Sequence, residues 1–153
     1  MTGFAINLPL PTTTKSSYEA RMTRTVVSSE AAPRAIGPYS QAIRQTVGTT
    51  QMLFLSGQIP LDPESMLIVG ENASEQTERV MLNIEAVLKA GGATFGHVVK
   101  TTIFLLDMND FAAVNEVYAK RFEGIEPPAR STIQVARLPR DARVEVEMTA
   151  VIP

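Results

Sequence analysis

The side chains with the clearest chemical potential in this sequence are an arginine, a threonine and a glutamate near the C-terminal end. Arg130 and Thr132 lie two residues apart in the stretch 129–135, and Glu145 lies in the stretch 143–152. Both stretches have the composition of β-strands, in which successive side chains point to opposite faces. An arginine and a carboxylate on neighbouring strands either pair as a salt bridge or form a polar site, and the spacing alone leaves both interpretations open.

The composition excludes several other chemistries. The 153 residues contain no cysteine and a single histidine, His97. Disulfides, a thiolate nucleophile and a cysteine-ligated metal are therefore excluded, and one histidine argues against a Ser-His-Asp triad or a histidine-rich metal site. We therefore expect no metal site built from these residue types. The net charge of -2 argues against a nucleic-acid partner, and the longest apolar stretches are strand-sized, so we also expect no membrane span.

The elements that must position these residues alternate between strands and helices. Ser74 is the expected cap of a helix that ends at Gly91-Gly92, and Asn109 or Asp110 is expected to open a second helix. Two helices separated by strands usually cover one face of a single sheet, which predicts an α+β fold. The expected strands are residues 25–29, 40–47, 51–55, 98–106, 129–135 and 143–152.

Each predicted helix has an apolar stripe at i, i+3 or i+4 spacing, which is typical of a helix packed on a sheet. The expected stripe residues are Thr77, Val80, Ile84, Val87 and Leu88 in the first helix and Val114, Val117, Tyr118 and Phe122 in the second.

The strand pattern also predicts which face each charged residue occupies. Val144, Val146 and Met148 share the face suited to helices, so Glu145 lies on the opposite face. We expect Arg130 and Thr132 to share this helix-free face with Glu145. Residues 52–55 are apolar on both faces, so the uncovered face is partly apolar and partly charged. This profile favours a homo-oligomer, whose subunit interfaces are common places for small-molecule sites.

Four stretches carry a resemblance to a known family. They are residues 36–42 (IGPYSQA), 55–60 (LSGQIP), 98–114 with Asn115 next, and 128–147 (PARSTIQVARLPRDARVEVE). In this order and spacing they make residues 25–153 resemble the RidA/YjgF family of enamine/imine deaminases. The resemblance implies a chorismate-mutase-like α+β fold, a homotrimer and three clefts between its subunits.

The resemblance further implies an activity and a site. Family members hydrolyse 2-imino acids such as 2-iminobutanoate and 2-iminopropanoate to 2-keto acids and ammonia without a cofactor, as a repair of metabolite damage. By position, Arg130 matches the residue that holds the substrate carboxylate, and Glu145 matches the acid that positions the attacking water. Thr132 stands where many members have cysteine and is expected to act through its backbone. The matches to the substrate-binding pocket are Tyr39 from a neighbouring subunit, Ser56, Gly57 and Asn115, with Ile36 and Gly37 in a loop near the cleft.

Other interpretations stay open. The same fold and pocket could serve a non-enzymatic protein that binds a small carboxylate or keto acid. A ribonuclease or translation inhibitor is disfavoured by the acidic composition and the lack of two catalytic histidines. Residues 1–24 form an extension, for which three interpretations stay open: a targeting segment, a plain extension, or the product of an upstream start. We expect a cytoplasmic protein, or a mitochondrial one if the extension is a transit segment.

Overall fold

The computed structural model describes residues 22–153, so the predicted extension of residues 1–24 falls almost entirely outside it. Within the described residues the chain forms six strands and two α-helices, joined by loops and short 3-10 turns. The elements are β1 (Met22–Val27), β2 (Ala42–Val47), β3 (Thr50–Leu55), α1 (Ala73–Ala90), β4 (Val98–Leu105), α2 (Phe111–Lys120), β5 (Ala129–Gln134) and β6 (Val144–Ile152).

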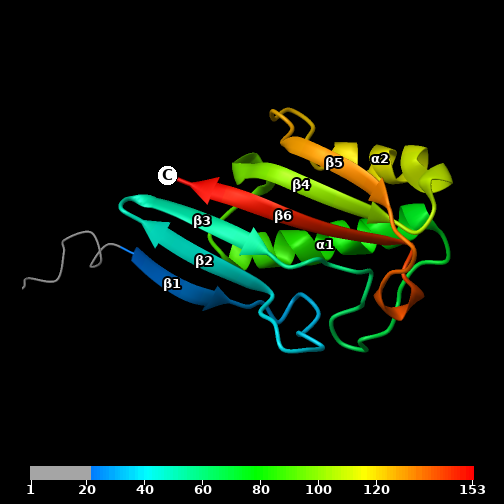
Figure 1. Ribbon diagram of the computed structural model, residues 1–153, viewed down its shortest axis with the longest axis horizontal. Coiled ribbons are helices and arrows are strands. Elements are labelled where there is room, and N and C mark those ends of the chain that lie inside the picture. The colour runs from blue at the N-terminus through cyan, green and yellow to red at the C-terminus, as the bar shows by residue number, and fades with distance from the viewer. Residues whose placement is uncertain (1–21) are drawn as a thin grey trace, which may run out of the picture.

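The strands form one mixed sheet with the order β1-β2-β3-β6-β4-β5. All neighbours are antiparallel except β4 and β5, which are joined through α2 and run parallel. Both helices lie on the same side of the sheet, behind it in Figure 1. The prediction of an α+β fold with two helices on one face is confirmed.

The observed helix boundaries agree with those predicted from the sequence except at the N-cap of α1. Asn72, and not Ser74, is the N-cap of α1, because its side chain accepts a hydrogen bond from the Glu75 N–H at 3.0 Å. At the other end, a Cβ on Gly91 would lie 2.4 Å from Leu53 Cδ2. A larger residue at this position would therefore displace the fully buried side chain of Leu53. The first strand also begins earlier than expected, at Met22.

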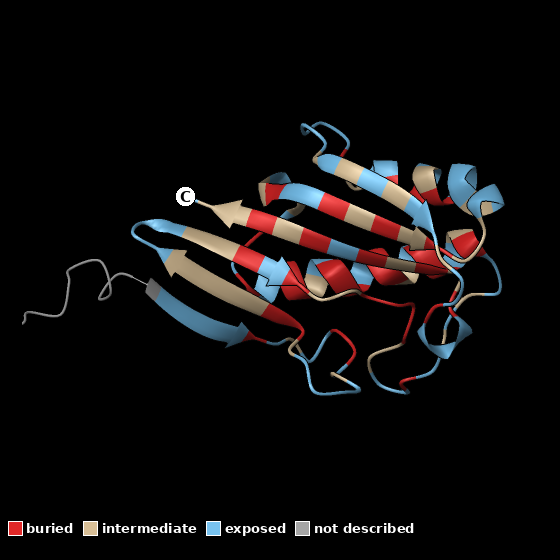
Figure 2. Ribbon diagram, in the orientation of Figure 1, coloured by how far each residue is buried: buried red, intermediate tan, exposed pale blue. Residues whose placement is uncertain are grey.

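The core lies between the sheet and the helices. The predicted stripe residues of both helices are buried, and they pack on the inward side chains of β3, β4 and β6. Along β6 buried and more exposed residues alternate, which Figure 2 shows as changing bands of colour. Val144, Val146 and Met148 are buried, as predicted from the period-2 pattern.

Strand pairing corrects one predicted placement. Glu145 pairs with Phe104 and lies on the helix-free face, as expected. Arg130, however, pairs with Thr101, whose hydroxyl contacts Tyr118 of α2, and Thr132 pairs with the buried Ile103. Directly paired residues point to the same face. Arg130 and Thr132 therefore lie on the helix-bearing face, opposite Glu145.

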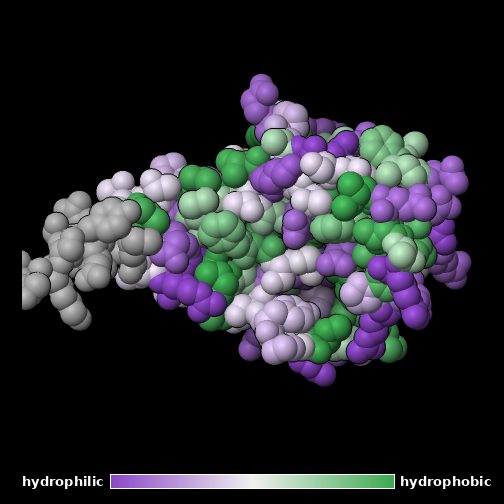
Figure 3. Space-filling view, viewed as in Figure 1, coloured by the Kyte–Doolittle hydropathy of each residue, from purple (hydrophilic) through white to green (hydrophobic). Residues whose placement is uncertain are grey.

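The helix-free face is open in the single chain and mixed in character. Val26, Phe54 and Ile133 on this face are 60%, 43% and 45% exposed, respectively. Figure 3 views the sheet from this side and shows apolar and hydrophilic residues interspersed on it. The expectation of a partly apolar, partly charged uncovered face is confirmed, while its burial in an oligomer stays a prediction.

Candidate functional site

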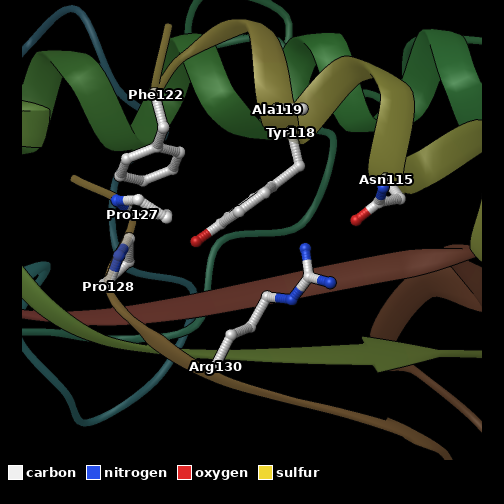
Figure 4. Close-up of a pocket in the computed structure, with 7 residues that line it drawn as sticks. All are labelled: Asn115, Tyr118, Ala119, Phe122, Pro127, Pro128 and Arg130. Atoms are coloured by element: carbon white, nitrogen blue, oxygen red, sulfur yellow. The ribbon is translucent and has the colours of Figure 1, made fainter. Parts of the chain in front are cut away.

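A pocket of about 480 Å³ lies between α2 and the start of β5. We call it the arginine pocket. Arg130 extends from β5 toward α2, and its guanidinium lies below Tyr118 and Asn115 in Figure 4. Two prolines close the pocket where the chain enters β5. Its lining residues are Asn115, Tyr118, Ala119, Phe122, Pro127, Pro128 and Arg130.

The Arg130 guanidinium is held by aromatic rings. Its Cζ lies 4.8 Å from the centroid of the Tyr118 ring and 5.8 Å from that of Phe111. Both distances are within the range of a cation–π interaction. Among residues 22–153, no carboxylate lies within 4.0 Å of a nitrogen of this side chain. Its positive charge is thus not neutralised by any carboxylate in the described part of the chain.

Tyr118 is a fixed part of this pocket. It is 4% exposed, and its hydroxyl is 3.1 Å from the Thr101 hydroxyl, to which it donates a hydrogen bond. Burial raises the pKa of the Tyr118 phenol, while the hydrogen bond to Thr101 and the charge of Arg130 act in the opposite direction. The ring next to Arg130 is therefore neutral at physiological pH.

A second pocket, of about 280 Å³, lies on the other face of the sheet. We call it the glutamate pocket. It is formed where the chain leaves β3, beside the start of β6, and the loops near residues 36–39 and 139 complete its wall. Its lining residues are Ile36, Tyr39, Ser56, Gly57, Ile59, Pro139 and Glu145.

The Glu145 carboxylate packs directly on the backbone of Gly57. A Cβ at Gly57 would lie 1.9 Å from Glu145 Oε1, so no larger residue fits without moving the carboxylate. The segment around Gly57 is itself fixed on both sides. Gln58 and Val146 exchange backbone hydrogen bonds of 2.9 and 3.1 Å, and the Ser56 hydroxyl donates to the Ser40 carbonyl at 2.7 Å.

The surroundings of Glu145 favour its neutral form. Burial raises the pKa of its carboxyl, and the like charge of Glu147 two residues further along β6 raises it further. A carboxyl group with a raised pKa is better suited to take up and return a proton near neutral pH than an exposed glutamate.

Tyr39 forms the outer wall of the glutamate pocket. Its ring is 46% exposed, and its hydroxyl accepts a hydrogen bond from the Ile36 N–H at 3.2 Å. The tyrosine and the 36–39 loop thus form one local unit. An exposed ring beside a pocket can close over a ligand or contact a second protein chain.

The predicted site residues therefore fall into two groups. Asn115 joins Arg130 in the arginine pocket, while Tyr39, Ser56 and Gly57 join Glu145 in the glutamate pocket. Thr132 lines neither pocket, and its Oγ1 is buried without a hydrogen-bond partner among residues 22–153. Whether these residues act in one reaction stays a prediction, because the two pockets open on opposite faces of the sheet.

Two residues that shape the arginine pocket were not predicted from the sequence. Tyr118 was expected only as part of the core stripe, and Phe111 was assigned no role. One feature of the sequence could have marked Tyr118 as more than a core residue. Its hydroxyl is a polar group on an otherwise apolar stripe, and a buried phenol needs a hydrogen-bond partner. No comparable signal marked Phe111, whose contact with Arg130 depends on how α2 crosses β5.

Two further observations bear on the candidate chemistry. Among residues 22–153, no group of three or more His, Cys, Asp or Glu residues is arranged to hold a metal ion. In the same part of the chain, neither α-helix combines the length and the apolar character needed to cross a bilayer.

Comparisons with known proteins agree with this architecture. Residues 29–152 match the family model described as Endoribonuclease L-PSP. Protein DfrA of Myxococcus xanthus is 55% identical over 86% of this chain and 98% of its own length. The mouse protein named 2-iminobutanoate/2-iminopropanoate deaminase is 47% identical over 84% of this chain and 91% of its own. The crystal structure of the YjgF gene product of E. coli, 39% identical, superposes with a TM-score of 0.76 over 84% of this chain and 99% of that one.

Proposed function

This chain belongs to the YjgF/RidA family, and from that premise we propose that it hydrolyses 2-imino acids to 2-keto acids and ammonia. The observation that carries the proposal is the positive charge of Arg130, which lies in a pocket and has no carboxylate partner among the residues that the structure describes. A planar guanidinium can hold a carboxylate through two parallel hydrogen bonds, and a 2-imino acid carries that group next to its reactive carbon. The name of the mouse relative supports the same substrate class, because 2-iminobutanoate and 2-iminopropanoate are both 2-imino acids with small aliphatic side chains.

The placement of the two pockets supports a site shared between copies of the chain. Arg130 and Glu145 lie on opposite faces of the sheet, so one chain cannot bring both to one small substrate. We infer that one subunit supplies the arginine pocket with Asn115 and Thr132, and its neighbour supplies the glutamate pocket with Tyr39. The open helix-free face fits burial in such an assembly. A homotrimer with three clefts is the form we propose.

The reaction then needs little from the protein beyond positioning. The carbon of a protonated imine is already electrophilic. Arg130 binds the carboxylate, and the Glu145 carboxylate accepts a proton from a water molecule as its oxygen bonds to that carbon. The product is a carbinolamine. Glu145 returns the proton to the nitrogen. As the C–N bond breaks, Glu145 accepts the proton of the carbinolamine hydroxyl, so that the keto acid and ammonia are left, and this proton then passes to solvent. The backbone at Thr132 completes the cleft, and no cofactor takes part.

The decisive test is imine hydrolysis by wild type and by Arg130→Ala. A threonine dehydratase generates 2-iminobutanoate in the assay, and the rate of 2-ketobutanoate release is followed against the uncatalysed rate. We expect acceleration by wild type and none by Arg130→Ala. Arg44→Ala is the matched control, because Arg44 lines neither pocket. Activity of Arg130→Ala equal to that of wild type would refute the assignment of the carboxylate-binding residue.

Mixing two inactive variants tests the shared site directly. Arg130→Ala retains an intact glutamate pocket, and Glu145→Gln retains an intact arginine pocket. When the two are unfolded together and refolded as mixed assemblies, some clefts receive one intact pocket from each variant. Activity should return in the mixture and not in either variant treated alone. A mixture that stays inactive although mixed assemblies are present by native mass spectrometry would contradict the shared site.

The same experiments separate deamination from two other functions. A protein that binds 2-ketobutanoate through Arg130 but does not accelerate hydrolysis would be a carboxylate-binding protein. RNA cleavage, which the family description mentions, is not supported by the histidine inventory. The single His97 lines neither pocket, and its Nδ1 accepts a hydrogen bond from the Thr94 N–H at 3.0 Å.

We propose that this activity is cytoplasmic. A mitochondrial location is the alternative if residues 1–24 act as a transit segment. The mature N-terminus, determined by mass spectrometry of the native protein, distinguishes the two. An N-terminus near residue 24 in a mitochondrial fraction would overturn the cytoplasmic assignment.

A further inference from the structure

Arg130 is held in a different way from the arginines that form salt bridges. Arg121, Arg137 and Arg143 each pair with at least one carboxylate. Arg130 has no such partner among residues 22–153, and its Cζ instead lies over two aromatic rings. A carboxylate partner fixes an arginine but also neutralises its charge and occupies its N–H donors. An aromatic face attracts the cation and does neither.

We propose that Tyr118 and Phe111 are positioning residues, which hold the Arg130 guanidinium for an incoming carboxylate while leaving its charge and N–H groups free. This inference rests on the proposed function, because it assigns the carboxylate of the substrate to Arg130. It adds that binding strength depends on two rings that need not contact the substrate. A flexible arginine side chain loses conformational entropy when it binds a ligand. Because the rings already restrict the Arg130 side chain in the folded protein, less entropy is lost on binding.

The two rings differ in how firmly they are fixed. Tyr118 is buried, hydrogen-bonded to Thr101 and packed against Phe122 at a centroid distance of 4.8 Å. Phe111 is the first residue of α2, is 38% exposed and lies farther from Arg130. Tyr118 therefore supplies the fixed support, and Phe111 supplies a weaker one at the rim. The ring of Tyr118, and not its hydroxyl, faces the guanidinium. A phenylalanine at position 118 should therefore support Arg130 as tyrosine does.

The test compares two ligands of nearly equal shape, 2-ketobutanoate and its neutral amide, by isothermal titration calorimetry and as inhibitors of imine hydrolysis. Tyr118→Leu should weaken carboxylate binding about 3- to 30-fold, the range expected for a half-buried cation–π interaction. Phe111→Leu should weaken it about 2- to 5-fold, since the ring is more exposed. Binding of the amide should stay within about twofold, because it gains little from a charged partner. The KM for the imine should rise with a smaller change in kcat.

Two matched variants separate positioning from general packing. Tyr118→Phe keeps the ring, loses the hydrogen bond to Thr101, and should retain carboxylate binding within about twofold. Phe95→Leu removes a ring that packs edge-on against Phe122 at 5.5 Å but lies outside the arginine pocket, and it should bind like wild type. If Tyr118→Leu does not fold, the exposed position of Phe111 still permits the comparison.

The outcomes are distinct. Loss of carboxylate affinity with retained amide affinity in the leucine variants supports the inference. Equal affinity of wild type and both leucine variants for 2-ketobutanoate overturns it and leaves the deaminase proposal in place. Equal loss for both ligands also overturns it, because the rings would then shape the pocket without acting on the arginine. A wild-type protein that neither binds 2-ketobutanoate nor hydrolyses the imine refutes the proposed function, and this inference with it.

Discussion

Gly57→Ala should impair catalysis by the glutamate pocket without impairing substrate binding by the arginine pocket. The added Cβ would lie 1.9 Å from Glu145 Oε1, 2.8 Å from its Cδ and 3.1 Å from its Cγ. An ordinary contact begins near 3.4 Å, so the carboxylate oxygen must move by about 1.5 Å. The backbone of Gly57 is not in the left-handed region, so alanine adds no backbone strain there. The displacement of Glu145 is thus the main local consequence.

The size of the effect follows from that displacement. Moving a reacting group by roughly 1 Å costs on the order of 100-fold in rate, so we expect kcat for imine hydrolysis to fall about 100-fold. In the proposed shared cleft the substrate carboxylate is held by Arg130 of the neighbouring subunit, which the substitution does not touch, so KM and 2-ketobutanoate binding should stay within about threefold of wild type. Coupled imine hydrolysis gives kcat and KM, and calorimetry gives the binding constant.

The control for this variant is Gly96→Ala. A Cβ at Gly96 would have its nearest neighbour at 3.6 Å, Thr94 Oγ1, and Gly96 lines neither pocket. Gly96→Ala should keep wild-type kinetics. The proposed role of Glu145 is refuted if Gly57→Ala keeps kcat within threefold of wild type while a crystal structure shows the Glu145 carboxylate displaced. It is equally refuted if KM rises and kcat does not change.

Three other predictions concern pH, assembly and stability. Glu147→Gln removes a like charge that raises the pKa of Glu145, so the acid limb of the kcat profile should move to lower pH; an unmoved or upward-shifted limb would contradict this electrostatic coupling. Phe54→Asp places a charge on the open helix-free face, and light scattering should show smaller assemblies with unchanged far-UV circular dichroism; an intact trimer would exclude this face from the interface. Asn83→Ala leaves two carbonyls of the 59–61 loop without the amide that donates to them at 3.3 and 2.9 Å. Its free energy of unfolding in urea should fall by about 2–4 kcal/mol, and a change below about 0.5 kcal/mol would show that these bonds add little.

The sequence predicted the elements and their buried stripes well, because periodicity reports which residues share a face. Val80, Ile84 and Val87 recur at helical spacing, and all three are buried under the sheet. The exception at the start of α1 has a local cause. Asn72 and Ser74 are both good caps, and the chain uses Asn72, whose side chain also donates to the Glu75 carboxylate at 2.9 Å.

The face of Arg130 could not be predicted in the same way. The alternation of side chains along a strand predicts that Arg130 and Thr132 share a face. Which face they share depends on how β5 pairs with β4, a strand some 30 residues earlier in the chain. The alternation was misleading because Ile133 is apolar and exposed, whereas Arg130 is charged and partly covered. At an edge strand beside a short helix, a charged residue can lie on the helix-bearing face and an apolar one on the open face. The guanidinium of Arg130 can lie against aromatic rings there while it remains open to solvent.

The position of β5 at the edge of the sheet also bears on aggregation. An edge strand presents a row of unpaired backbone groups that can pair with another chain, and Ile133 adds exposed apolar surface to this one. Two features of the strand counter such pairing. Pro127 and Pro128 lie just before it and have no N–H to donate, and Arg130 places a charge near its start. Removing that charge for a functional study also removes a safeguard against misassembly, so Arg130→Lys is the safer companion to Arg130→Ala.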